Sequence, residues 1–279
     1  MENQLLDIVV LAIVQGIAEF LPISSSGHLA LFGKYLGIDP EANLTLGILL
    51  HAGSLLAICI FYYRTLLGFL HKDQWHLALM IVLGTLPAAG VGVALKVSGL
   101  AEKLFNTPLL IGLCFLITAT VLRMTDKEKL IVRNSPDAPP TPLKEISVRQ
   151  ALIVGFAQAF AILPGISRSG STIASGILCG ISREAAGNFS FLLALPAIGG
   201  AVLIELLETL RHTGDTAQNL SWQLLMIGFI LSALVSFGAL ALLMKLIRKG
   251  KLVWFSWYLY CMGIAVIIGH FAKFYVVVL

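Results

Sequence analysis

Charged residues are scarce in this sequence. Only 12% of the 279 residues are charged and 58% are hydrophobic, whereas a soluble domain is about a quarter charged and about half apolar. The few charges fall between long apolar runs rather than along one face of amphipathic helices. This pattern excludes an ordinary soluble domain and is typical of a helical bundle that uses lipid as its solvent.

Close pairs of cysteines are also lacking. Each of the four cysteines stands alone in an apolar run, so we expect neither disulfides nor a zinc site. The N-terminus has no basic segment or small-residue cleavage site, and we expect its first apolar run to stay in the mature protein. The net charge of +4 indicates basic cytoplasmic loops rather than an acidic partner, and no nucleic acid is expected.

The apolar runs are of two kinds. Two of them, 8–23 and 151–166, lead into a Ser/Gly-rich turn and then a second apolar run, 29–38 or 172–181, that is too short to cross a bilayer. This pattern predicts re-entrant hairpins, whose broken backbone is tolerated only where it lines a cavity or is buried in protein. We therefore predict an all-α integral membrane protein with six transmembrane helices and two re-entrant helical hairpins. The six spanning runs are 46–63, 76–95, 107–122, 185–204, 222–244 and 252–272.

The sequence also repeats internally. Shifted by 143 residues, QGIAEFLPISSSG (15–27) aligns with QAFAILPGISRSG (158–170), and every spanning run aligns with another. Self-similarity over this length indicates a duplication. We predict one membrane domain made of inverted repeats, 1–122 and 150–279, joined by the proline-rich linker 123–149.

The distribution of Lys and Arg supports the inverted arrangement. If both hairpins crossed the membrane, the 19 basic residues would divide 10 to 9 between the two sides. If they are re-entrant, the division is 13 to 5 with Arg168 inside the membrane, and only this arrangement obeys the positive-inside rule. We therefore expect a multi-pass protein of the cell (inner) membrane with both termini extracytoplasmic and the linker cytoplasmic. The thirteen are Arg64, Lys72, Arg123, Lys127, Lys129, Arg133, Lys144, Arg149, Arg183, Lys245, Arg248, Lys249 and Lys251.

The two breaks, FLPISSSGH (20–28) and LPGISRSGST (163–172), carry the polar residues. Broken helices of inverted repeats meet near the membrane midplane, where exposed amides and helix N-termini favour an anion. The planar guanidinium of Arg168 suits phosphate oxygens. Glu19 and His28 also indicate a function, because an ionisable residue at membrane depth costs free energy.

Structural roles compete with functional ones at several positions. Gln15, one helical turn before Glu19, is either a ligand close to the site or an interhelical contact. For Arg168 we favour a functional role over a purely structural pairing with Glu19. His51, in the middle of a span, stays open, and the aromatic run 253–260 predicts an interfacial belt. We favour a structural role, satisfying backbone groups freed at the breaks, for Ser24, Ser26, Ser169 and Ser171.

At these residues the sequence resembles a known family. QGIAEFLPISSSGH resembles the first signature of the bacitracin-resistance family of undecaprenyl-diphosphate phosphatases, and PGISRSGST resembles the second. LLHAGSLLA and FSFLLALPAIGGA resemble the flanking segments, so the likeness covers essentially the whole chain. It implies hydrolysis of undecaprenyl diphosphate to the monophosphate and inorganic phosphate at the outer face of the membrane. This recycles the carrier lipid for peptidoglycan synthesis and confers bacitracin resistance.

The resemblance also implies the site residues. It makes Glu19, Ser25, His28 and Arg168 catalytic. The resemblance also implies a divalent cation, Mg²⁺ or Ca²⁺. The family motif has Glu or Gln at the position of Gln15, and with Gln there the site has one carboxylate fewer. We therefore expect the ion to be held by Glu19 and the substrate's oxygens. The residues expected to bind substrate are Gln15, Ser24, Ser26, Gly27, Ser167, Ser169, Gly170 and Thr172.

Two questions stay open at this point. The nucleophile is either Ser25, activated by Glu19 or His28, or a water activated by the same groups. Paired re-entrant hairpins are also the architecture of alternating-access carriers, so the same anion site is compatible with a polyprenyl-phosphate flippase, or with a lipid-binding structural protein. A base beside Ser25 favours hydrolysis, because binding alone needs donors but no base.

Overall fold

The apolar runs form α-helices. The structure, a computed structural model, describes residues 2–36, 40–99, 104, 107–125, 142–211 and 221–272, and no β-strand occurs among them. The all-α prediction is confirmed for this part of the chain. The first half contains α1 (Glu2–Ala18), α2 (Ser25–Leu36), α3 (Pro40–Phe61), α4 (Tyr63–Gly68), the short η1 (Lys72–Gln74), α5 (Trp75–Val97) and α7 (Pro108–Met124). The second half contains η4 (Leu143–Glu145), α8 (Val148–Phe160), α9 (Arg168–Leu178), α10 (Arg183–Arg211), α11 (Trp222–Arg248) and α12 (Val253–Phe271).

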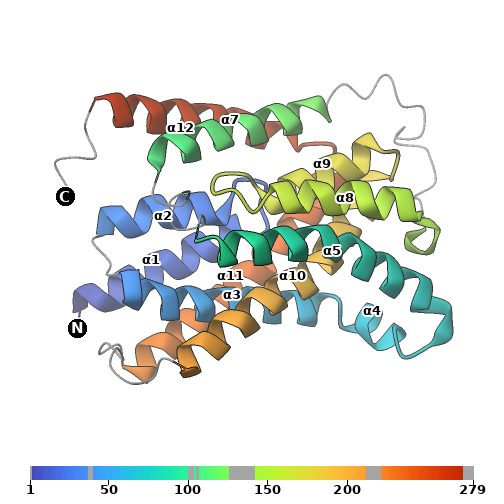
Figure 1. Ribbon diagram of the computed structural model, residues 1–279, viewed down its shortest axis with the longest axis horizontal. Helices are drawn as coiled ribbons and strands as arrows, with labels where there is room; N and C mark the ends of the chain where they lie inside the picture. The colour runs from blue at the N-terminus through green and yellow to red at the C-terminus, as the bar shows by residue number, and fades with distance from the viewer. Residues whose placement is uncertain are drawn as a thin grey trace.

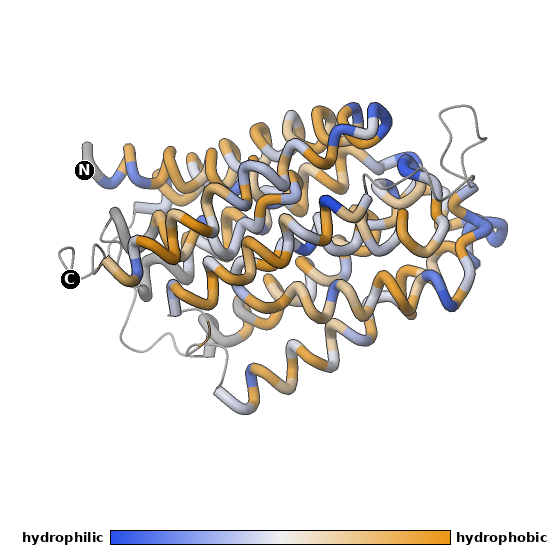
Figure 2. The backbone as a smooth tube through the Cα atoms, turned by 90° about the horizontal axis from the view of Figure 1, so that it is seen from above, coloured by the Kyte–Doolittle hydropathy of each residue, from blue (hydrophilic) through white to orange (hydrophobic). Residues whose placement is uncertain are grey.

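Several helices have the length and composition of membrane spans. Among the residues that the structure describes, four segments are long and apolar enough to cross a membrane: Lys72–Val97, Arg183–Ile204, Trp222–Arg248 and Val253–Phe271. Hydrophobic residues prevail along the helices, and the most hydrophilic stretches lie chiefly toward their ends (Figure 2). The protein is therefore a multi-pass membrane protein. Shorter apolar helices are Gln4–Ala18, Thr45–Phe61, Pro108–Met124 and Val148–Phe160.

Helices of the two halves pack against each other (Figure 1). α1 lies on α11 and α8 lies on α5, while α7 runs beside α12. Under the shift of 143 residues, α1 corresponds to α8 and α5 to α11, so the first two contacts are equivalent. α2 and α9 begin at Ser25 and Arg168, and α3 and α10 begin at Pro40 and Arg183, both 143 residues apart. Residues 126–141 of the predicted linker lie outside the described residues.

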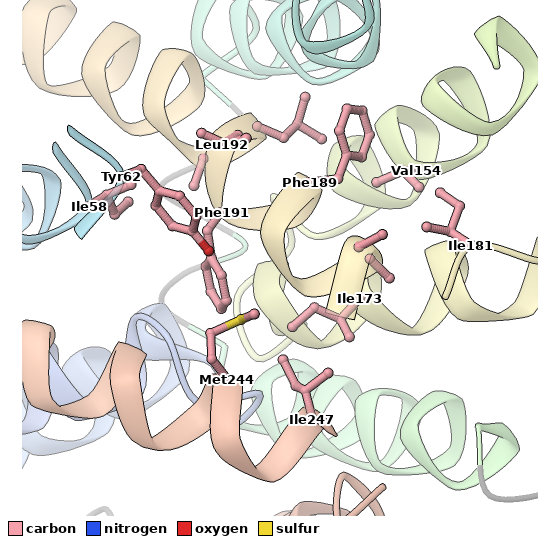
Figure 3. Close-up of a cluster of buried hydrophobic side chains, with 14 of the residues drawn as sticks. Ile58, Tyr62, Val154, Ile173, Ile181, Phe189, Phe191, Leu192, Met244 and Ile247 are labelled. Carbon is pink, nitrogen blue, oxygen red and sulfur yellow. The ribbon is translucent and has the colours of Figure 1, made fainter. Parts of the chain in front are cut away.

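The largest hydrophobic cluster holds the first break in place. It gathers side chains from α3, α8, α9, α10 and α11, with Phe189, Phe191 and Ile173 among them (Figure 3). Phe20, which directly follows Glu19, is fully buried in the same cluster and meets Phe191 edge to face with ring centroids 5.7 Å apart. Burial of this ring anchors the backbone next to Glu19.

Basic residues gather at one end of the bundle. Arg248 at the end of α11 donates to Glu184 at the start of α10 over 2.6 Å. Arg183, also at the start of α10, donates to the carbonyl of Thr125, just after α7, over 3.4 Å. These contacts bring the end of α7, the start of α10 and the end of α11 together.

Candidate functional site

The two breaks meet in the interior of the protein. α1 ends at Ala18 before the first break, and α8 ends at Phe160 before the second. A Cβ on Gly27 would come within 3.1 Å of the Cα of Gly165, and a Cβ on Gly170 would come within 3.2 Å of the Cβ of Pro22. Gly27 and Gly170 are equivalent in the repeat, and so are Pro22 and Gly165. The same close contact between the breaks is therefore made twice.

Each break ends in a serine that caps the following helix. The Ser24 hydroxyl accepts a hydrogen bond from the Gly27 amide over 3.3 Å, and the Ser167 hydroxyl accepts one from Gly170 over 3.1 Å. Ser24 has a φ of 72°, the one positive φ of a non-glycine residue in the described part of the chain. Such a conformation costs about 1–3 kcal/mol and is retained where the surroundings enforce it, often at functional sites.

Glu19 is the centre of the polar network. Its Oε2 accepts hydrogen bonds from the Ser25 hydroxyl over 2.8 Å and from Gln15 Nε2 over 3.0 Å. Its Oε1 forms an ion pair with Nη2 of Arg168, which links the first break to the second. The carboxylate is 6% exposed, and these donors compensate its buried charge. The structure thus brings together three of the residues expected to be catalytic (Glu19, Ser25 and Arg168) and one expected to bind substrate, Gln15.

One hydrogen-bond donor of the Arg168 guanidinium is unpaired among the described residues. Its Nη2 is taken by Glu19, whereas its Nη1 is buried and has no hydrogen-bond partner among the described residues. A buried unpaired donor costs free energy unless a ligand or water satisfies it. A guanidinium with one nitrogen on a carboxylate and another unpaired can bind an anion next to that carboxylate.

His28 lies beside this network but faces another way. Its Nδ1 is 2.8 Å from the Ser24 carbonyl oxygen and its Nε2 is 2.7 Å from the hydroxyl of Tyr258. The buried ring packs on Phe115 with centroids 5.1 Å apart. Of the two proton acceptors expected from the sequence, it is Glu19 that contacts Ser25.

Comparison with known proteins identifies the family of this chain. The family described as "Bacitracin resistance protein BacA" matches residues 8–265. The chain belongs to the BacA family. A protein of Halothermothrix orenii named undecaprenyl-diphosphatase is 39% identical over 268 residues, 95% of this chain and 98% of that protein. Proteins with the same name from Rhodopirellula baltica (39% over 270 residues, 95% and 98%) and Carboxydothermus hydrogenoformans (36% over 259 residues, 93% and 95%) are similar over nearly their whole lengths.

Other hydroxyl groups in the two signature motifs form hydrogen bonds with backbone carbonyls or with one another. The Ser169 hydroxyl donates to the Leu21 carbonyl of the opposite break over 3.2 Å. Thr172 donates to the Arg168 carbonyl over 2.8 Å and contacts Ser190 of α10. The hydroxyls of Ser24 and Ser26 lie 3.3 Å apart. These contacts agree with the structural role favoured for the serines of the breaks.

Two site residues were not expected from the sequence. Thr118 of α7 donates to the Gly165 carbonyl over 3.2 Å and accepts from the Ser167 amide over 3.1 Å, so it fixes the second break. Tyr258 belongs to the run expected as an interfacial belt, yet its hydroxyl contacts His28. A lone threonine or tyrosine in an apolar span carries no signal in the sequence that would reveal such a partner.

His51, which the sequence left open, lies at the site. Its Nδ1 is 2.8 Å from the Gly47 carbonyl oxygen, and its Nε2 is 3.7 Å from Oε2 of Glu19. No cluster of three or more His, Cys, Asp or Glu residues suited to a metal occurs within the described ranges. A cation at Glu19 would therefore depend on other oxygen ligands, among them those of the substrate.

Proposed function

We propose that this protein hydrolyses undecaprenyl diphosphate, or a similar polyprenyl diphosphate, to the monophosphate and inorganic phosphate. The activity recycles the carrier lipid for peptidoglycan synthesis and so confers bacitracin resistance. Support comes from relatives named undecaprenyl-diphosphatase that match this chain over almost their entire length. The observation within the chain that carries the proposal is the 2.8 Å contact of Ser25 with Glu19, beside an arginine with an unpaired Nη1.

The chemistry follows from these three side chains. Arg168 binds the terminal phosphate through Nη1 and neutralises charge that develops in the transition state. Ser25 Oγ attacks the terminal phosphorus as its proton moves to Oε2 of Glu19, and the bond to the bridging oxygen breaks. The lipid monophosphate leaves, and water then releases inorganic phosphate from Ser25. Direct attack by a water held at Glu19 is the alternative.

A divalent ion belongs to this proposal. Mg²⁺ or Ca²⁺ would be held by Glu19 together with substrate oxygens, and when bound it would neutralise phosphate charge. His28 acts as a positioning residue in this scheme, because its ring nitrogens are directed at Ser24 and Tyr258. It thereby holds the turn that presents Ser25.

The proposal includes a topology of six transmembrane helices and two re-entrant hairpins in inverted repeats. α8 has 13 residues, or about 20 Å at 1.5 Å per residue, against a hydrocarbon core of about 30 Å. α2 and α9, with 12 and 11 residues, are shorter still. The close packing of the breaks supports re-entry, because irregular backbone at membrane depth must be buried in protein or line a cavity.

We place the protein in the cell (inner) membrane with both termini extracytoplasmic and the basic end of the bundle cytoplasmic. The uneven distribution of Lys and Arg supports this orientation. The contacts of Arg183 and Arg248 at the shared end of α7, α10 and α11 agree with it.

A polyprenyl-phosphate flippase is the second candidate, and the paired hairpins favour it. Measuring the release of inorganic phosphate distinguishes a hydrolase from a flippase. Purified protein in detergent with a synthetic polyprenyl diphosphate and Mg²⁺ or Ca²⁺ is expected to release inorganic phosphate and leave the lipid monophosphate. Ser98→Ala, at the exposed end of α5, is the matched control for site variants. Binding of the lipid without phosphate release would contradict hydrolysis and favour the flippase.

A further inference from the structure

Tyr258 connects an outer helix of the bundle to the first break. It belongs to α12, which packs mainly on α7 (Figure 1), and it is 41% exposed. A tyrosine on the surface of a membrane helix normally directs its hydroxyl toward lipid headgroups or water. The Tyr258 hydroxyl instead lies 2.7 Å from Nε2 of His28, and the two rings stack with 13° between their planes. The phenol is therefore directed into the protein, at a residue of the first signature motif.

The contacts of His28 determine which of its nitrogens carries the proton. Nδ1 is 2.8 Å from the Ser24 carbonyl oxygen, which can only accept, so Nδ1 is the donor. In the neutral ring Nε2 is then an acceptor, and the Tyr258 hydroxyl donates to it. The other tautomer would place the Nδ1 lone pair against the carbonyl oxygen. The hydroxyl of Tyr258 thus favours the one tautomer that can bind Ser24.

The Ser24 carbonyl controls the position of Ser25. It accepts from Nδ1 of His28 and also, over 3.3 Å, from the backbone amide of the same residue. This carbonyl belongs to the peptide group that joins Ser24 to Ser25, and Ser24 has the strained φ of 72°. The Ser25 hydroxyl that follows donates to Oε2 of Glu19 over 2.8 Å. The hydrogen bonds of one imidazole therefore orient the peptide that carries the reactive hydroxyl.

We propose that Tyr258 is a positioning residue of the reaction. Its hydroxyl holds His28 as the Nδ1–H tautomer, and His28 in turn holds the Ser24–Ser25 peptide so that Ser25 meets Glu19. Reacting groups must be held close to the productive geometry, and small displacements cost rate. The kinetic consequence rests on the proposed hydrolysis with Ser25 as nucleophile, whereas the tautomer of His28 does not depend on it.

Tyr258→Phe removes the donor and keeps the stacked ring. Nε2 of His28 becomes a buried acceptor without a donor, and the imidazole is free to shift. We expect kcat to fall about tenfold while KM for a synthetic polyprenyl diphosphate stays within about twofold, because the nucleophile and not the substrate is misplaced. Unchanged kcat would overturn the proposal and leave Tyr258 a packing role. A higher KM with unchanged kcat would likewise overturn it and indicate contact with the lipid.

Tyr260→Phe is the matched control. Tyr260 lies two positions further along α12, and its hydroxyl contacts Thr120 of α7 over 3.1 Å, away from the breaks. Both kinetic constants are expected to stay within about twofold of the wild type. Circular dichroism and melting temperature in detergent establish that both variants are folded.

A double variant tests whether Tyr258 acts through His28. In the His28→Ala background the imidazole is gone, so Tyr258→Phe is expected to cause no further loss of kcat. A further loss of about tenfold would show that the hydroxyl acts without His28 and would overturn the proposed route.

Nitrogen NMR of the histidine rings tests the tautomer without substrate. Full-length protein is labelled with ¹⁵N-histidine, and the His28 signals, one set among six histidines, are assigned by their loss in His28→Ala. We expect Nδ1 protonated and Nε2 unprotonated in the wild type, and a change of both signals in Tyr258→Phe but not in Tyr260→Phe. A protonated Nε2 in the wild type would overturn the proposal. The proposed function fails separately, if wild-type protein releases no phosphate from polyprenyl diphosphate with any divalent ion.

Discussion

Three consecutive serines of the first break have different surroundings. Ser24 caps α2 and Ser26 contacts Ser24, so both hydroxyls belong to the turn. Ser25, between them, donates to Glu19. The left-handed backbone of Ser24 directly precedes Ser25 and turns the chain where the hydroxyl meets the carboxylate. Composition alone makes the three residues equivalent, and the distinction arises from the backbone.

Ser25→Ala tests whether this hydroxyl is the nucleophile. We expect turnover to fall by several powers of ten while substrate binding survives, because losing a true nucleophile removes the covalent route. Ser26→Ala, which removes a hydroxyl from the same turn, is expected to be far milder. Turnover is measured in detergent with saturating lipid diphosphate and added divalent ion. If Ser25→Ala keeps a tenth or more of wild-type activity, water is the nucleophile.

Arg168→Lys separates charge from geometry. An ammonium can pair with Glu19 but cannot also place a second nitrogen on a phosphate as the planar guanidinium does. The variant is expected to fold normally and to lose at least 100-fold in kcat/KM, about 2.7 kcal/mol of transition-state stabilisation. Near wild-type turnover would mean that the positive charge alone is sufficient.

The histidines show what the sequence could and could not decide. His28 lies in a signature motif close to Ser25, so it was one of the two groups considered as the base for Ser25, yet its Nε2 contacts Tyr258. His51 lies in an apolar span, where one histidine has no partner visible in the sequence, and the fold places it at Glu19. Contacts between residues on different helices depend on helix rotation, which the hydrophobic pattern of membrane helices constrains weakly.

At the scale of elements, the breaks are held together by glycines. An alanine at position 27 would place its Cβ 2.7 Å from the Phe115 ring as well as close to Gly165. A contact of 2.7 Å does not occur, so the Phe115 ring or the first break must shift, and the backbone of Gly165 at 3.1 Å leaves little room for either. Since Glu19 and Arg168 lie on opposite breaks, we expect a shift of the first break to disturb their ion pair.

Gly27→Ala is therefore expected to reduce activity more than a single added methyl group would suggest. Overpacking of this kind costs about 1–3 kcal/mol of stability, and we expect a lower melting temperature and a large loss of kcat. Gly90→Ala, in α5 with nothing within 4 Å of the added Cβ, is the matched control and is expected to keep both. Phosphate release and thermal melting in detergent give the two readouts, and unchanged turnover in Gly27→Ala would show that the breaks tolerate displacement.

The elements themselves were largely predictable. Each apolar run forms a helix. The segments 20–28 and 163–172 form the two breaks, because Pro and Gly interrupt helices and Ser caps the helices that follow. The repeat also anticipated the equivalent starts of α2 and α9. The packing of α1 on α11 and of α8 on α5 was not readable from hydropathy, since every face of a membrane helix is apolar.

At the scale of the whole molecule, the proposed orientation rests on the distribution of basic residues. The α10 and α11 residues Glu184 and Arg248 form an ion pair at the end that collects the basic residues. The α4 segment lies at the opposite end of the molecule from the N-terminus (Figure 1). This placement is compatible with the proposed inverted repeat, in which three spans per half reverse the direction of the second half.

Cysteine labelling in intact cells tests the orientation. Lys144 precedes α8 and Ser98 follows α5, and both are exposed in the structure. In a background without the four native cysteines, a membrane-impermeant maleimide is expected to label Ser98→Cys in intact cells and Lys144→Cys only after permeabilisation. The physical reason is that Lys and Arg are retained on the cytoplasmic side, and Lys144 belongs to the basic end. Labelling of Lys144→Cys from outside with Ser98→Cys protected would reverse the orientation. Labelling of both from outside would place an even number of crossings between Ser98 and Lys144, so that α7 would not be a single span, and the inverted repeat itself would have to be abandoned.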